Sequence, residues 1–174
     1  MRRSALGEGE KAVTIQGMAK KIVYIETSIP SAYVEDRRDL TSRFQLQQTR
    51  IWWERYSRYY ALVSSEAVLA ELRRTPFPRQ AEAIDLVRDL TMLPVTEEVS
   101  GAARIYQKHL LMPRGHLGDA VHMALACVHE VDFLLTWNCR HLANPHKVEH
   151  LRVINMRLGL VTPMVLTPQM LIQE

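Results

Sequence analysis

The chain has 174 residues, of which 47% are hydrophobic and 24% charged, and its formal net charge is +3. This composition is typical of one globular domain with a sizeable core and excludes an intrinsically disordered chain. No apolar run approaches the roughly 20 residues needed to cross a bilayer. The first residues also lack the continuous apolar core of a signal peptide, so we expect a cytoplasmic protein that contacts no membrane.

The first 20 residues show no periodicity and predict a mobile extension, with Met18 as a candidate natural start. Residues 21–174 then predict a single domain. Four basic and two acidic residues fall within the extension, so the remaining chain is nearly neutral and has no global field to attract nucleic acid. The two cysteines, Cys127 and Cys139, lack the spacing of a zinc site, and we expect reduced thiols.

Short apolar runs alternate with helical patterns in the first half of the domain. Residues 22–25 predict a strand, followed by a short helix or turn over 28–36 and a long helix over 39–60. A second strand over 61–65 leads into a helix over 65–74, whose first residue, a serine, is a candidate N-cap.

The same alternation continues through the middle of the chain. A third strand is predicted over 92–95, between helices over 78–90 and 97–111. An alanine-rich helix over 118–130 precedes the most apolar strand, over 131–136.

The last elements are a helix over 147–159 that ends at a glycine, an edge strand over 163–166, and a short helix begun by Thr167 and Pro168. Strands that alternate with helices predict an α/β fold, with a small doubly wound parallel sheet of four to five strands and helices on both faces.

Oxygen-bearing side chains follow two of the predicted strands. Glu26, Thr27 and Ser28 come directly after the first strand, and Asn138 follows the strand that ends at Thr136. Ligands of open parallel sheets bind at the carboxyl ends of the strands. We therefore expect these side chains to meet at one edge of the sheet.

Acidic residues on two predicted helices add to this set. Glu66 and Glu71 lie five residues apart, about 140° around a helix, so they cannot both face one site. Glu71 lies nearer the apolar face, where a carboxylate needs a cation. Asp119 opens the alanine-rich helix and shares a face with His122, which the pattern favours as a packing residue over a catalytic base.

Structural explanations stay open for several of these residues. Asp119 could cap its helix, Glu71 could pair with Arg74 on a solvated face, and Asn138 could serve a turn. Glu26 is harder to explain in this way, because acidic residues are poor strand formers. Together these carboxylate and amide oxygens suit Mg²⁺ or Mn²⁺ better than zinc.

Five segments in this order resemble a PIN domain: YIETS (24–28), VLAELRR (68–74), GDAVHMALA (118–126), DFLLTWNCRHLAN (132–144) and LTPQML (166–171). The resemblance covers residues 21–172. Within this family, the chain most resembles the VapC-type toxin branch of prokaryotic toxin–antitoxin systems, in the subgroup that combines IETS with TWN.

The resemblance implies a doubly wound nuclease fold with acidic residues around one or two Mg²⁺ or Mn²⁺ ions. The family's catalytic and metal-binding positions fall on Glu26, Glu71, Asp119 and Asn138, and its small hydroxyl residue falls on Thr27 or Ser28. Two positions depart from the family pattern, since Glu26 replaces the common aspartate and Asn138 replaces an acid.

The implied reaction is metal-assisted hydrolysis of RNA phosphodiester bonds by the toxin of a type II toxin–antitoxin pair. The resemblance also implies a homodimer and a protein antitoxin that blocks the site. Two alternatives stay open: an RNA-processing PIN nuclease without a toxin role, and a non-catalytic PIN-like module that binds RNA or protein.

An arginine-rich segment over 37–58 is a candidate RNA surface, with six arginines against two acidic residues. Five aromatic residues in or beside it could stack on bases or instead pack on the sheet or a second subunit: Trp52, Trp53, Tyr56, Tyr59 and Tyr60. Packing is favoured for most of them, because adjacent tryptophans point in different directions. Arg140 and His141, beside the predicted site, are better candidates for substrate contact.

Overall fold

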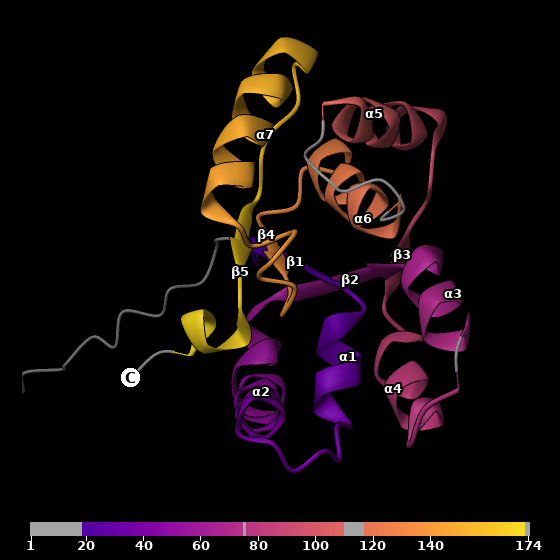
Figure 1. Cartoon of the computed structure of the whole chain (residues 1–174), viewed down its shortest axis with the longest axis vertical. Helices are drawn as coiled ribbons and strands as arrows, with labels where there is room; N and C mark the ends of the chain where they lie inside the picture. The colour runs from indigo at the N-terminus through magenta and orange to yellow at the C-terminus, as the bar shows by residue number, and fades with distance from the viewer. Residues whose placement is uncertain (1–18, 75, 110–116, 173–174) are drawn as a thin grey trace, which may run out of the picture.

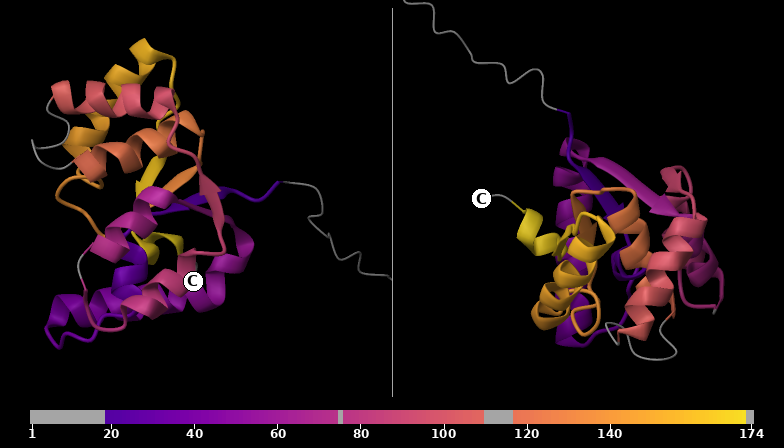
Figure 2. Two further views of the ribbon diagram at one scale, coloured as in Figure 1. Left: turned by 90° about the vertical axis from the view of Figure 1, so that its right-hand side faces the viewer. Right: turned by 90° about the horizontal axis from the view of Figure 1, so that it is seen from above.

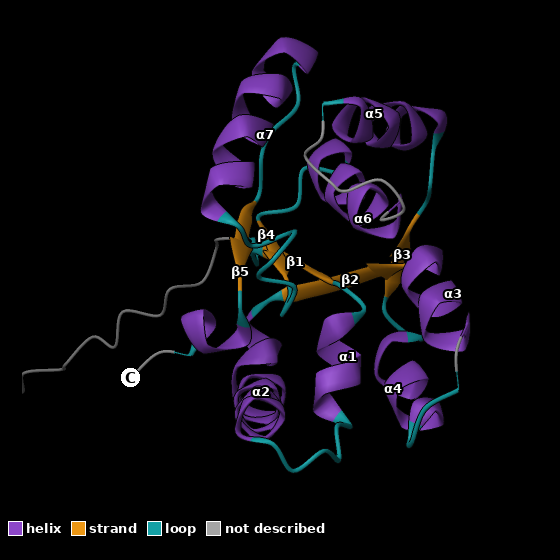
Figure 3. Cartoon of the chain, in the orientation of Figure 1, coloured by secondary structure: helices purple, strands orange, loops and turns teal. Residues whose placement is uncertain are grey.

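The computed structural model describes residues 19–74, 76–109 and 117–172, so residues 1–18 of the predicted extension lie outside the described part. Five parallel strands form one sheet in the order β3-β2-β1-β4-β5 (Figure 3). In chain order they are β1 (Ile22–Ile25), β2 (Ala61–Ser65), β3 (Thr91–Leu93), β4 (Phe133–Leu135) and β5 (Met164–Leu166). The prediction of a small doubly wound parallel sheet is confirmed.

Helices cover both faces of this sheet (Figure 1). One face carries α1 (Ser28–Tyr33), α2 (Leu40–Ile51), α3 (Glu66–Arg74) and α4 (Gln80–Val87). The other face carries α5 (Glu97–Lys108), α6 (Leu117–Val128) and α7 (Pro145–Leu158). The side view in Figure 2 shows the same two groups of helices with the sheet between them.

The order of the strands explains the two faces. The chain steps from β1 to β2 to β3 in one direction, and then returns to β4 and β5 on the other side of β1. Because crossovers between parallel strands are right-handed, reversing the direction places the later helices on the opposite face. The reversal puts a topological switch point between β1 and β4, which is where open α/β sheets bind ligands.

Many of the fully buried core residues lie in β1 and α6. The apolar residues of β1 from Val23 to Ile25 are fully buried, as is the Leu134–Leu135 pair of β4. The small side chains of α6, such as Ala120 and Ala124, are also fully buried. Because alanine side chains are small, α6 can pack closely against the sheet. This close packing brings the first turn of α6 near the switch point.

The predicted long helix over 39–60 is not continuous. After α2 the chain forms a π-helical turn over Trp52–Tyr56 and a 3₁₀ turn over Ser57–Tyr59. The Trp52 side chain is fully buried and its ring contacts those of Trp53 and Tyr60. A π turn holds one residue more than an α turn and changes the direction of the side chains that follow.

The ends of the helices agree with most of the signals in the sequence. Gly159 adopts the left-handed conformation (φ 69°) after α7, as its position predicted. The final helix is a 3₁₀ turn over Pro168–Leu171, and the Thr167 side chain does not cap it. No helix in the described ranges has both the length and the apolar character to cross a membrane.

Candidate metal centre

The switch point between β1 and β4 gathers polar side chains. Glu26 follows β1 and is only 5% exposed, and Thr136 follows β4 and is fully buried. The backbone N–H of Glu26 donates to the carbonyl of Leu135 (3.3 Å), which keeps the two strand exits in register. The sheet edge predicted from the sequence therefore exists, and it carries a buried carboxylate.

Hydroxyl groups orient the Glu26 carboxylate. Its Oε2 accepts from the Ser28 backbone N–H (3.1 Å), from Ser28 Oγ (2.5 Å) and from Thr136 Oγ1 (2.7 Å). Ser28 Oγ accepts in turn from the Trp137 N–H (2.8 Å). Every hydrogen bond that the described residues donate to Glu26 goes to Oε2, so Oε1 remains the oxygen for a further ligand.

Glu71 reaches the same site from the middle of α3. Its Oε2 accepts from Thr27 Oγ1 (2.7 Å) and lies 3.2 Å from Nε2 of His122. Its Oε1 lies against Gly118 in the first turn of α6, where an added Cβ would clash with that oxygen. Glu66, five residues earlier, is exposed, as the helical spacing requires.

His122 is the residue whose role sequence reasoning missed. Its side chain is 1% exposed, and Nδ1 lies 2.8 Å from the Tyr24 hydroxyl. That hydroxyl lies 2.8 Å from Ser65 Oγ, which also accepts from the Val68 N–H (3.4 Å). The sequence held a partial signal for Tyr24, the hydroxyl partner of His122. Tyr24 and Glu26 are two residues apart along the first strand, and such residues share a face.

The charges of Glu71 and His122 stabilise one another. Burial alone would lower the pKa of His122, but the hydrogen bond to Glu71 and the charges of the nearby carboxylates raise it above its ordinary value. Burial alone would raise the pKa of Glu71, but its contacts with His122 and Thr27 lower it. Burial raises the pKa of Tyr24, so this phenol stays protonated.

Glu26, Glu71 and His122 each offer a ligand atom, and these atoms all lie within 4.8 Å of one another. Ligands about 2.1 Å from a common ion lie about 3 to 4 Å apart. A small movement of these three side chains toward one another would therefore complete a metal site. Among the described residues, His122 is the only basic group in an ion pair with either carboxylate, and it can bind a metal only after it loses its proton. The buried negative charge and the donor set fit a divalent cation, and this cluster could hold a metal ion.

Asp119 and Asn138 form a pair beside this cluster. Asn138 Nδ2 donates to Asp119 Oδ1 (3.0 Å), and Asn138 Oδ1 accepts from the His141 N–H (3.1 Å). The donor at His141 and the acceptor at Asp119 together fix which way the amide points. Asn138 thus orients Asp119, whose charge acts on His122, and its amide oxygen is turned to its own loop.

Basic side chains lie in the turn after β4. Arg140 is exposed, and its carbonyl accepts from Asn144 Nδ2 (3.5 Å). His141 is half-buried, and its Nδ1 lies 3.4 Å from Nζ of Lys147. These groups lie in the turn that follows Asn138, whose Oδ1 accepts from the His141 N–H.

The aromatic residues of the arginine-rich segment mostly pack against the core. Trp52 is buried, Trp53, Tyr56 and Tyr60 pack against the core, and Tyr59 is largely exposed. Arg37 pairs with Glu35 (2.6 Å), and Arg50 lies over the Tyr33 ring. The structure favours packing over base stacking for most of these aromatic residues.

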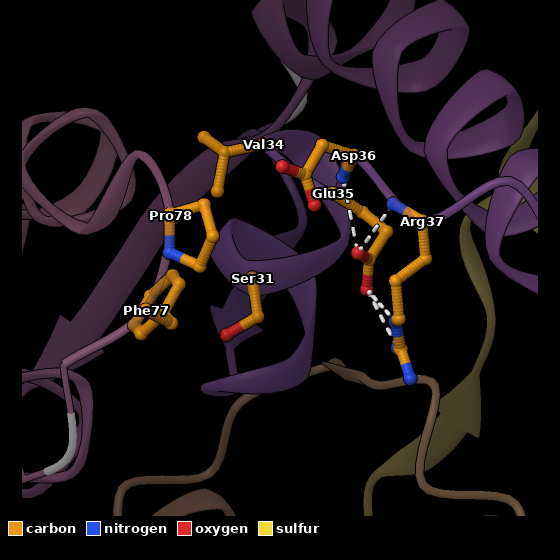
Figure 4. Close-up of a pocket in the computed structure, with 7 residues that line it drawn as sticks. All are labelled: Ser31, Val34, Glu35, Asp36, Arg37, Phe77 and Pro78. Carbon is orange, nitrogen blue, oxygen red and sulfur yellow. Dashed lines mark hydrogen bonds and ion pairs between the residues drawn. The ribbon is translucent and has the colours of Figure 1, made fainter.

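Two surface hollows lie away from the cluster. One of about 420 Å³ lies between the Glu35–Arg37 ion pair and the Phe77–Pro78 turn (Figure 4). Another of about 510 Å³ lies along β5 and α7 and includes Cys139. Neither contains Glu26, Glu71 or His122, so neither is the candidate metal centre.

No family model, curated protein or solved structure matches the chain.

Proposed function

We propose that this protein is a Mg²⁺- or Mn²⁺-dependent ribonuclease of PIN type. The supporting observation is the assembly of Glu26, Glu71 and His122 into one buried cluster at the switch point of a doubly wound parallel sheet. The order of the PIN-like motifs in the sequence supports the same function independently.

The chemistry follows from the donor set. A divalent ion held by Glu26, Glu71 and His122 would polarise a scissile phosphate and lower the pKa of an attacking water. Ser28 and Thr136 keep the Glu26 carboxylate in one orientation, and Thr27 does the same for Glu71. Arg140 is exposed in the turn after β4, where its guanidinium can bind an RNA phosphate.

The biological role that we propose is the toxin of a type II toxin–antitoxin pair in the cytoplasm. The resemblance to the VapC-type branch supports this role, and with it a homodimer and a protein antitoxin. Expression of the protein in a bacterial host should arrest growth, and Glu71→Gln should abolish the arrest. Cleavage in vitro without any effect on growth would favour an RNA-processing nuclease instead.

The enzymatic proposal is tested by RNA cleavage with Mn²⁺ and with Mg²⁺. We expect Glu71→Gln to lower the rate by roughly 100-fold or more, because it removes a charged metal ligand. Glu66→Gln is the matched control on the same helix and should leave the rate unchanged, since Glu66 is exposed. Equal rates for these two variants would refute a catalytic role for the cluster.

The orientation of Asn138 favours a second candidate, a non-catalytic module that binds RNA. The site has one carboxylate fewer than the family pattern, and the amide oxygen accepts from the His141 N–H. Filter binding distinguishes the two functions. RNA retention by wild-type protein, without cleavage by either metal, would establish the binding module.

A further inference from the structure

We infer that His122 is a direct nitrogen ligand of the metal and that it makes the centre prefer Mn²⁺ to Mg²⁺. The inference rests on the metal site of the proposed function, but it does not require that the substrate is RNA.

The Nε2 atom of His122 faces the carboxylates. It lies 3.2 Å from Glu71 Oε2 and 3.5 Å from Thr27 Oγ1. Two neighbouring ligands of an octahedral ion, each about 2.1 Å from the metal, are about 3 Å apart. The separation of Nε2 and Oε2 therefore suits adjacent positions around one ion. Because the ring is 1% exposed, solvent does not compete for this nitrogen.

Nδ1, on the opposite side of the His122 ring, has the hydrogen-bond partner that a metal-binding histidine requires. Such histidines donate the N–H of their other ring nitrogen to a fixed acceptor, which selects the tautomer. Here Nδ1 faces the hydroxyl of Tyr24, and that hydroxyl faces Ser65 Oγ. Donation from Nδ1 to Tyr24, and from Tyr24 to Ser65, is consistent with both contacts and directs the lone pair of Nε2 into the cluster.

The mixed donor set determines which ion is preferred. Mg²⁺ binds oxygen ligands and keeps several waters, whereas first-row divalent ions also accept an imidazole nitrogen, with an affinity that rises from Mn²⁺ towards Cu²⁺. The Asn138 amide donates to Asp119, and its oxygen accepts from the His141 N–H. Two carboxylates and one imidazole therefore favour Mn²⁺ over Mg²⁺.

Spectroscopy of the full-length wild-type protein tests the ligand directly. We expect electron spin-echo modulation of bound Mn²⁺ to show coupling to a coordinated imidazole nitrogen. Bound Mn²⁺ without nitrogen coupling would overturn the inference. This measurement needs no variant, so it does not depend on how a substitution affects folding.

Calorimetric titration of variants tests the selectivity. We expect Tyr24→Phe to lower Mn²⁺ affinity about tenfold, because it removes the partner of Nδ1, and His122→Gln to lower it further. Mg²⁺ affinity should fall less, so that the ratio of Mn²⁺ to Mg²⁺ affinity decreases. The control His150→Gln, an exposed histidine on α7, should change neither affinity. An unchanged ratio in folded His122→Gln would overturn the inference.

The outcomes also separate this inference from the ribonuclease proposal. Nitrogen-coordinated Mn²⁺ in a protein that cleaves no RNA would support the ligand assignment and refute the ribonuclease. Metal-dependent cleavage without nitrogen coupling would support the ribonuclease and refute the ligand assignment.

Discussion

Ser28 connects the two strand exits at the level of single atoms. Its hydroxyl donates to Glu26 and accepts from the backbone N–H of Trp137, so it joins the end of β1 to the loop after β4. The neighbouring hydroxyl of Thr27 plays the matching part for Glu71. The two hydroxyls of the IETS motif thus orient two different carboxylates.

Replacement of Ser28 tests this connection. Ser28→Ala should destabilise the protein by about 1 to 2 kcal/mol, because the partly buried N–H of Trp137 loses its acceptor. Mn²⁺ affinity should fall as well, since Glu26 loses a donor that orients it. Urea unfolding and calorimetric titration measure the two effects, with Ser100→Ala on α5 as the control. Normal stability and affinity in Ser28→Ala would contradict the role given to this hydroxyl.

The His122–Glu71 pair predicts how stability depends on pH in protein treated with a chelator. The folded pKa of His122 is raised, so its stabilisation is complete below the ordinary value of 6.5 and is lost as pH rises through the folded value. The folded pKa of Glu71 is lowered, so its stabilisation is complete above 4.5 and is lost as pH falls through the folded value. Stability should therefore be greatest between these two pH values.

Urea unfolding at several pH values checks this expectation. Wild-type protein should lose stability as pH rises above 6.5, and His122→Gln should lack this loss. The charges of Glu26 and Asp119 act on the same imidazole and strengthen the effect. An identical alkaline profile in the variant would show that the imidazole is not charged in the folded protein.

Prediction at the residue scale depended on how local each signal was. Glu26, Thr27 and Ser28 were expected at the sheet edge because a strand exit is visible in the sequence itself. The orientation of Asn138 was not predictable, because it is fixed by Asp119 from another helix and by the turn at His141. The role of His122 depends on Tyr24, which is 98 residues away along the chain.

The close approach of α3 and α6 is the feature of element packing on which the site depends. Glu71 Oε1 occupies the space that a side chain at position 118 would need. Gly118→Ala should change the melting temperature little, because a gain of about 1 kcal/mol in helix propensity is offset by the loss of the Glu71 contacts with Thr27 and His122. The same substitution should displace the Glu71 carboxylate and lower Mn²⁺ affinity.

Gly101→Ala is the matched control for this experiment. Gly101 lies within α5, where an added Cβ would meet only Arg104 Nη2 at 4.0 Å. It should gain about 1 kcal/mol in helix stability, with no loss of Glu71 contacts and with unchanged Mn²⁺ affinity. Equal affinities for the two glycine variants would show that Glu71 does not need this space.

Element prediction succeeded where the pattern was local. The bounds of β1 and β2 match the predicted strands at 22–25 and 61–65. The third strand, predicted over 92–95, is Thr91–Leu93, because it pairs with the end of β2 in a register that the sequence does not display. The π turn after α2 was also not predictable from the sequence, since it accompanies the burial of Trp52 in the tertiary core.

Metal binding should stabilise the whole molecule, because the cluster joins both faces of the sheet. Mn²⁺ at 100 times its dissociation constant should add about 2.7 kcal/mol to the free energy of unfolding. For a chain of this size, the melting temperature should rise by about 5 to 10 °C. Thermal unfolding with and without Mn²⁺ measures the shift, which Glu71→Gln should largely remove and Glu66→Gln should preserve.

The pairing of β1 with β4 has a consequence for synthesis. Glu26 and Thr136 are hydrogen-bonded although 110 residues separate them. A nascent chain exposes Glu26 early, yet the residue after β4 that completes its surroundings emerges 110 residues later, and long-range pairing of this kind forms slowly. If the protein cleaves RNA as proposed, a nascent chain stays inactive until β4 has left the ribosome.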